Sequence, residues 1–454
     1  MKTKRHEINM TEGSILKSII SFAIPMMMSS MLQIFFNAAD LIVVSRWTGS
    51  LAMASVGSTS QLTSLVVNLF LGMAIGSTVT ISRCYGAKDP DGIHRAVHTS
   101  VLFSILIGLT AFTLGQILCK PLLLITGTPS GEVLDGAVLY MRIVFFGTPA
   151  TVIYNYSAAA LRSVGDNKRP LYILAISGVV NFVLNLIFVI FFNMGVSGVA
   201  AATAISKYLS VFLLFRVLTR KDHVCRVQFK KLRIYKSELL SILKIGLPAG
   251  VYNIMTSFTN VIIQSSVNSF GAAAIAGNAA AANIESFTAC IKVAFRQATV
   301  TAVGQNYGAK KPDRMLKSVK VSLACVTVSC LVLGALMVVF AKQLLGIYIT
   351  DSPDAIRYGT IRLVLTAIPY FLSGVMQVTS GYLRGVGYST LTTVNAFVGM
   401  IAFRVVYVLF VFPIFGTFES LYIGTPITWI IVCSLNIISI MVVKDKVAKK
   451  MYQK

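Results

Sequence analysis

The chain has 454 residues, of which 56% are hydrophobic and 12% are charged, and its mean hydropathy is +0.77. This composition excludes a soluble globular protein and is typical of an integral membrane protein. The net charge of +24 could indicate a nucleic-acid binder, but its distribution favours a role in membrane orientation and contact with anionic lipid, with no nucleic acid as partner.

Twelve apolar stretches follow along the chain, each long enough to cross a hydrocarbon core of about 30 Å as a helix. We predict them near 15–44, 51–81, 96–118, 133–160, 170–192, 195–218, 239–268, 271–303, 317–341, 355–381, 389–412 and 419–443. With the N-terminus inside, most Lys and Arg fall on the inner face, so both termini are expected in the cytoplasm. The first span is too long to be the apolar core of a cleavable signal peptide.

The two halves of the chain repeat one another. The phrase Tyr-Gly-Ala-Lys-x-Pro-Asp occurs at Tyr85–Asp91 and again at Tyr307–Asp313, and Pro25 in the first span has its counterpart at Pro248 in the seventh. Repeats of this kind build many secondary transporters. Because each repeat holds six spans, we predict an all-α membrane fold of two six-helix lobes related by a pseudo-two-fold axis along the membrane normal.

We therefore predict an N-terminal lobe over 1–218, a basic linker over 219–238 and a C-terminal lobe over 239–454. The linker is expected to be a solvated tether that also anchors the topology. Pro25 and Pro248 each remove a helix hydrogen bond, so a kink or hinge is expected at the same place in both lobes.

Asp40 lies well inside the first span, where an ionisable residue usually marks an ion or substrate path. Gln33 and Asn37 share its helix face, and further polar groups fall at similar depth in the fifth and sixth spans. Those groups are Asn181, Asn185 and Thr203. Desolvation disfavours the charged carboxylate, so Asp40 with its neighbours is expected to exchange a proton or cation as access alternates. The alternative is a satisfied residue near the lipid headgroups.

A second polar region is expected in the C-terminal lobe. The seventh span carries a stripe of Asn253, Ser257, Asn260 and Gln264, but the position that matches Asp40 is Ile263. In the eighth span, Glu285, Lys292 and Arg296 share one face. These residues, together with Gln33, either line a water-filled substrate cavity or include an internal ion pair of Glu285 with Lys292 or a neighbour.

The sequence offers little for other functions. His94 and His98 are spaced as metal ligands can be, but a solvated helix start is the simpler interpretation, and the seven Cys show no paired spacing. No nucleophile–base pair or phosphate loop is recognisable, so neither an enzyme nor an ATP-driven pump is expected, and no metal or other cofactor.

Three segments, Phe36–Arg46, Ala160–Asp166 and Val303–Lys310, resemble the multidrug and toxic compound extrusion (MATE) family, and the resemblance covers nearly the whole chain. It implies an antiporter in the bacterial plasma membrane, expected here as a monomer, that exports organic, often cationic, compounds in exchange for protons or sodium.

The resemblance also implies which residues act. Asp40 corresponds to the coupling acid of the first helix, and Asn185 stands where some relatives have an aspartate, which favours protons over sodium. Thr256 and Gly374 stand where sodium-type members have acids, and Glu285 fits the DinF-like bacterial branch. The alternative function is a flippase or exporter of an anionic, lipid-linked or phosphate-bearing substrate, bound by Lys292, Arg296, Arg404 and Lys207.

Overall fold

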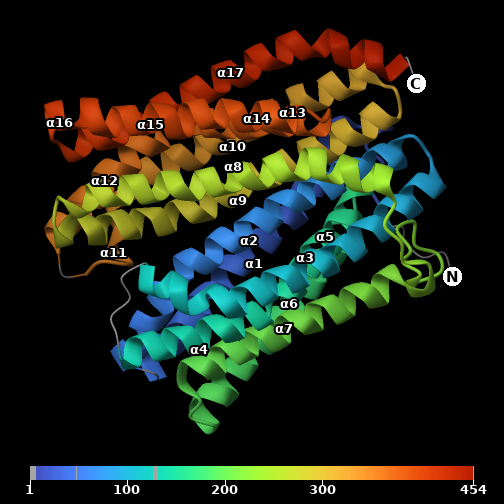
Figure 1. Ribbon diagram of the computed structural model, residues 1–454. Helices are drawn as coiled ribbons and strands as arrows, with labels where there is room; N and C mark the ends of the chain where they lie inside the picture. Colours follow the sequence, from blue (N-terminus) through green and yellow to red (C-terminus); the bar gives the residue numbers. More distant parts are fainter. Residues whose placement is uncertain (1–6, 48, 126–130, 351, 453–454) are drawn as a thin grey trace. The chain divides into compact units, whose positions relative to one another are not determined.

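The structure is a computed structural model that describes residues 7–47, 49–125, 131–350 and 352–452, and within these ranges every regular element is helical (Figure 1). The elements of the first half are α1 (Ile15–Trp47), α2 (Gly49–Gly86), α3 (Pro90–Ile125), α4 (Glu132–Phe146), α5 (Thr148–Ser163), α6 (Lys168–Leu186), η1 (Ile187–Phe191), α7 (Gly195–Leu218) and η2 (Phe229–Lys231). Those of the second half are α8 (Lys236–Asn268), α9 (Ala272–Gly308), α10 (Pro312–Val339), α11 (Ala341–Gly346), α12 (Pro353–Ala367), α13 (Tyr370–Gly385), α14 (Ser389–Ala396), η3 (Phe397–Ala402), α15 (Phe403–Val406), η4 (Tyr407–Val411), α16 (Phe412–Phe415) and α17 (Phe418–Tyr452).

Ten helical segments of the described chain are long and apolar enough to cross a membrane. The pair α12 and α13, bent by 51° between Ala367 and Tyr370, would make an eleventh span. The remaining predicted span, 271–303, corresponds to α9, which is 37 residues long but carries the polar stripe of Glu285, Lys292 and Arg296. The all-helical membrane class is confirmed, and helices are the form in which a chain satisfies its backbone within lipid.

Matching irregularities interrupt the helices of the two halves. The π-helical turn η1 ends the span that begins with α6, and η4 occupies the corresponding place in the second half, near the end of the span that begins with α14. The second half has a further π turn, η3, just before the four-residue helix α15, which carries the buried Arg404. Such turns are rare, and they occur frequently at functional sites.

The chain forms two compact units whose limits fall inside helices. Unit 1 holds Met28–Gly250 and the segment that ends at Ile8, and unit 2 holds Asn9–Met27 and Val251–Lys454. Both boundaries lie two residues beyond a proline, Pro25 in α1 and Pro248 in α8, although each helix continues through its proline. The lobe boundaries at 218 and 239 stay a prediction from the sequence.

The basic linker differs from the solvated tether expected from its sequence. Cys225 and Val227 are buried in a core cluster with Leu161 and Leu218, so the middle of the linker packs on unit 1. Its backbone is also held, because the Gln228 N–H donates to Nε2 of His98 at 3.0 Å. The prediction was wrong because it rested on the linker's charged side chains, whereas its few apolar side chains are buried against unit 1.

This docking also corrects the expectation for the two histidines of α3. His98 is fully buried and its Nδ1 lies 2.8 Å from the His94 carbonyl oxygen, so its two ring nitrogens connect α3 to the linker. The start of this helix is therefore not solvated at His98. No group of three metal-ligating side chains occurs among the described residues.

Candidate functional site

A close approach of two helices brings Asp40 to its neighbours. Gly178 of α6 faces Phe36 of α1, and a Cβ atom at Gly178 would stand 1.8 Å from the Phe36 ring. Asp40, one turn beyond Phe36, meets Asn181 and Asn185, which lie one and two turns beyond Gly178. The glycine thus makes room for the ring, and the ring sets the spacing at which polar groups of α1 and α6 can bond.

Asp40 is held by the amides of α6. Nδ2 of Asn185 donates to Oδ1 of Asp40 at 2.5 Å. With the Asn181 amide oriented so that both its polar atoms are satisfied, its nitrogen donates to the same Asp40 oxygen at 3.0 Å and its oxygen accepts from the Thr203 N–H at 3.3 Å. The structure therefore brings together four of the five residues expected at the coupling site.

The fifth, Asn37, lies elsewhere. Its side chain is exposed, as is that of Gln33, and neither joins the hydrogen bonds around Asp40. Asp40 itself is partly buried, four residues before the end of the span Ile15–Val44, or about 6 Å below that end. Val43 and Val44 beyond it are buried in an apolar cluster with residues of η1 and α7.

Two residues that were not assigned to this site act on Asp40. Lys207 lies one turn beyond Thr203 on α7 and attracts the Asp40 carboxylate, although no salt bridge joins them among the described side chains. Tyr140 of α4 packs against the apolar cluster of Val43 and Val44 and also lies within electrostatic reach of Asp40. The spacing of Thr203 and Lys207, one helical turn, was the signal that could have found the lysine.

In unit 2, Glu285 is an ion-pair residue. Nη2 of Arg362 in α12 lies 2.6 Å from Oε2 of Glu285, and Thr366 donates to Oε1 at 2.8 Å. Arg362 also donates to the Asn278 carbonyl oxygen at 3.0 Å, and its guanidinium lies over the ring of Tyr422. Of the two interpretations left open for Glu285, the geometry favours the internal pair, with Arg362 and not Lys292 as the partner.

Lys292 and Arg296 make neutral contacts with α13. Nζ of Lys292 donates to Oγ of Ser373 at 2.9 Å and lies 3.8 Å from the centre of the Tyr370 ring. Arg296 donates from Nη1 to Oε1 of Gln377 at 3.2 Å. The two bases thus follow one another along the interface between α9 and α13. Neither base takes part in a salt bridge among the described residues.

The polar stripe of α8 is only partly gathered. Gln264 accepts from Nδ2 of Asn278 and donates to Oδ1 of Asn268, both at 2.9 Å, so it belongs to the network that includes Arg362. Ser257 donates to the Asn253 carbonyl oxygen at 3.4 Å within the helix, and Asn260 is exposed. These residues do not line one described cavity.

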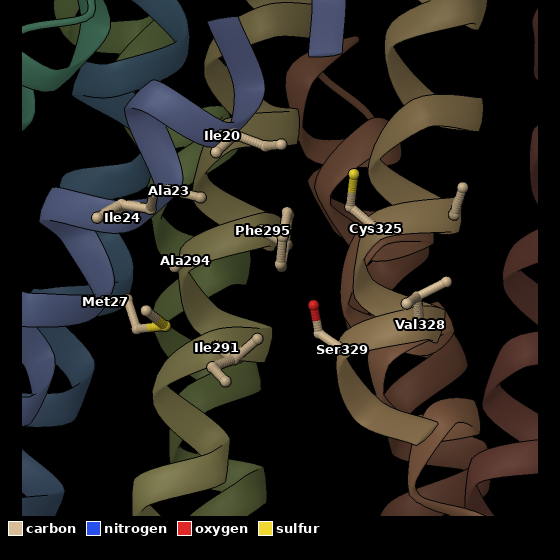
Figure 2. A pocket seen from close by; sticks show the side chains of 11 residues that line it. Ile20, Ala23, Ile24, Met27, Ile291, Ala294, Phe295, Cys325, Val328 and Ser329 are labelled. Carbon is tan, nitrogen blue, oxygen red and sulfur yellow. The ribbon is translucent and has the colours of Figure 1, made fainter. Parts of the chain in front are cut away.

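A pocket of about 500 Å³ in unit 2 has a different, apolar lining (Figure 2). The first segment of α1, α9 and α10 surround it, and Figure 2 shows Met27 and Phe295 among its walls. None of the residues expected in the substrate cavity lines it. Because its α1 residues, from Ile20 to Met27, flank Pro25, a bend there would change the shape of the pocket.

Comparisons with known proteins agree with this architecture. The model of the MatE family matches the chain twice, over residues 25–187 and 248–410. The probable multidrug resistance protein YoeA of Bacillus subtilis is 28% identical over 386 residues, which cover 83% of this chain and 82% of that protein. The multidrug export protein MepA of Staphylococcus saprophyticus is 23% identical over 418 residues, which cover 92% of each chain.

Solved structures share the fold. A crystal structure of MATE in complex with MaL6 superposes with a TM-score of 0.90 at 22% identity, covering 99% of this chain and all of the other. An outward-facing conformation of a multidrug resistance MATE family transporter superposes with a TM-score of 0.88 at 23% identity, over 98% of this chain and 100% of that one.

Proposed function

The chain belongs to the MATE family of multi-pass membrane transporters, and we propose that it exports organic, mainly cationic or amphipathic, compounds in exchange for protons. The observation that carries the proposal is Asp40, an acid within a membrane-spanning helix that two amides hold and that forms no salt bridge among the described side chains. Sodium coupling is less well supported, because Asn185 supplies an amide where a second carboxylate would strengthen a cation site.

Asn181 can serve both protonation states of Asp40. With its nitrogen toward Asp40, the amide donates to the charged carboxylate. With the amide turned over, the nitrogen donates to Oγ1 of Thr203 at 3.3 Å and the oxygen faces Asp40, where it can accept from the protonated acid. Rotation of one side chain therefore keeps the cluster hydrogen-bonded when the proton arrives or leaves.

Lys207 adds a charge that favours the ionised acid, so a proton must compete with it. We propose that Asp40 is protonated from outside, that cargo leaves in this state, and that proton release to the cytoplasm resets the transporter. Pro25, in the helix that carries Asp40, is the proposed hinge. The protein is further proposed to lie in the bacterial plasma membrane with both termini cytoplasmic.

The proposal is tested by reconstituting the purified protein in vesicles and following efflux of a fluorescent organic cation such as ethidium. An imposed proton gradient should drive efflux by the wild type, and Asp40→Asn should abolish it while the variant still inserts and folds. Asn37→Ala, at an exposed position of the same helix, is the control and should transport normally. A sodium gradient that alone drives efflux at constant pH would contradict proton coupling.

A second candidate is the export of an anionic or phosphate-bearing substrate. The observation that favours it is the pair of bases Lys292 and Arg296 of α9, whose described contacts with α13 are to neutral side chains. Dependence of transport on those bases, and not on the charge of Asp40, would distinguish this candidate from the first.

A further inference from the structure

Arg384, near the end of α13, is a buried arginine for which the described part of the chain supplies no hydrogen-bond partner. Its side chain is 0% exposed, and none of its three guanidinium nitrogens finds an acceptor. An arginine offers five N–H donors and keeps its charge, so burial of all of them without a partner is unfavourable. A buried charge of this kind is stabilised when an opposite charge lies beside it.

None of the salt bridges among the described residues involves Arg384. The Arg384 guanidinium lies 4.4 Å from the centre of the Tyr252 ring, and the hydroxyl of this buried tyrosine also has no partner among the residues that the structure describes. The charge of Arg296 acts on Arg384 and repels it. Nε of Arg296 is itself buried and unpaired.

The backbone explains why the two arginines meet. Gly381 lies three residues before Arg384, and a Cβ atom there would stand 2.9 Å from the Arg296 carbonyl oxygen. The helices α9 and α13 therefore touch at this level, and Arg296 and Arg384 lie within electrostatic reach of one another. Lys292, one turn of α9 away, is already engaged by Ser373 and Tyr370, so it does not belong to this unpaired group.

We propose that Arg384 and Tyr252, neither of which has a role assigned above, join Arg296 to form a binding site for a phosphate or carboxylate group. Guanidinium groups bind such oxyanions through paired N–H donors, and a tyrosine hydroxyl can add a third. The site lies at the end of α13 that the distribution of Lys and Arg places toward the cytoplasm, so the anion would enter from inside. The source is either a free anion or the headgroup of an anionic lipid.

The site lies in unit 2 and Asp40 lies in unit 1, so the two proposals can fail separately. Binding of an anion at Arg384 can be measured without any ion gradient. Loss of proton-driven efflux in Asp40→Asn would leave it untouched.

The test measures the melting temperature of the purified full-length protein in detergent, with inorganic phosphate titrated against chloride at constant ionic strength. A saturable rise is expected for the wild type, with at least a tenfold loss of apparent affinity in Arg384→Met. Arg384→Lys, which keeps the charge without the planar fork, should show an intermediate loss. Arg357→Gln, which removes an exposed arginine of α12, is the matched control and should respond like the wild type.

A second readout separates binding from a purely structural role. Without phosphate, Arg384→Met should be at least as stable as the wild type, because it removes an uncompensated buried charge. Nanodiscs with phosphatidic acid or with phosphatidylcholine then identify the source. Stabilisation of the wild type but not of Arg384→Met by phosphatidic acid alone assigns a lipid headgroup, whereas stabilisation by inorganic phosphate assigns a free anion. Equal responses of the wild type and Arg384→Met, or no response to either anion, would overturn the proposal.

Discussion

Removal of the Glu285 charge should expose how strongly α9 and α12 depend on their ion pair. In Glu285→Gln, Arg362 keeps its bond to the Asn278 carbonyl oxygen but loses the carboxylate that lies 2.6 Å from Nη2. Removing one partner of a buried pair costs about 3–5 kcal/mol, and the 14% and 19% exposure of the two side chains places this pair at the lower end, about 3 kcal/mol. For a unit of this size that corresponds to a fall of about 6–12 °C in melting temperature.

The double variant Glu285→Met/Arg362→Met tests whether the loss of stability in Glu285→Gln comes from an unpaired Arg362 charge. It removes both charges and leaves neither uncompensated, so it should recover most of the stability lost in the single variant. Glu238→Gln is the control, because its partner Arg95 is 41% exposed and such a pair contributes at most about 1 kcal/mol. Melting curves followed with a thiol-reactive dye give all four values. A Glu285→Gln variant as stable as the wild type would refute the pair and restore Glu285 as a cavity residue.

Two further predictions concern unit 1. Gly178→Ala should displace Phe36 and cost about 1–3 kcal/mol of stability. The control Gly346→Ala should cost little, because no described atom lies within 4 Å of its Cβ position. Equal melting temperatures of the two variants would contradict the packing at Gly178. Burial, and secondarily the charge of Arg169, lowers the pKa of His223 to about 4, and the neutral ring accepts from the Cys225 N–H at 3.0 Å. The neutral form therefore contributes about 3 kcal/mol above pH 6.5 that is lost as the pH falls toward 4, so proteolysis of the linker should increase over that range. His223→Asn can still accept from Cys225 but does not titrate, and an identical pH profile for this variant would exclude His223 as the cause.

The parts of the site that the sequence predicted depend on local spacing. Asp40 stands out as an acid in an apolar helix, and Asn181 and Asn185 follow one another by one helical turn, so their common face could be read directly. The repeats predicted two similar halves, and the family resemblance is confirmed.

What the sequence could not give depends on contacts between distant elements. Arg362 lies 77 residues from Glu285, and nothing in the spacing connects α12 with α9. The burial of Arg384 could not be predicted either, because an arginine at the end of a helix beside a glycine turn is normally solvated, whereas the side chain of Arg384 is 0% exposed. The packing of the linker could not be predicted, because its many charged residues indicate a solvated segment. Two apolar residues of the linker, Cys225 and Val227, are nevertheless buried in a core cluster of unit 1.

The central claim is that one carboxyl group, Asp40, carries the exchanged proton. The most direct measurement is proton flux into vesicles on addition of cargo, recorded with an internal pH dye for the wild type and Asp40→Asn side by side. Cargo-dependent proton movement in the wild type and none in the variant is the predicted result. Undiminished proton movement in Asp40→Asn would contradict the account.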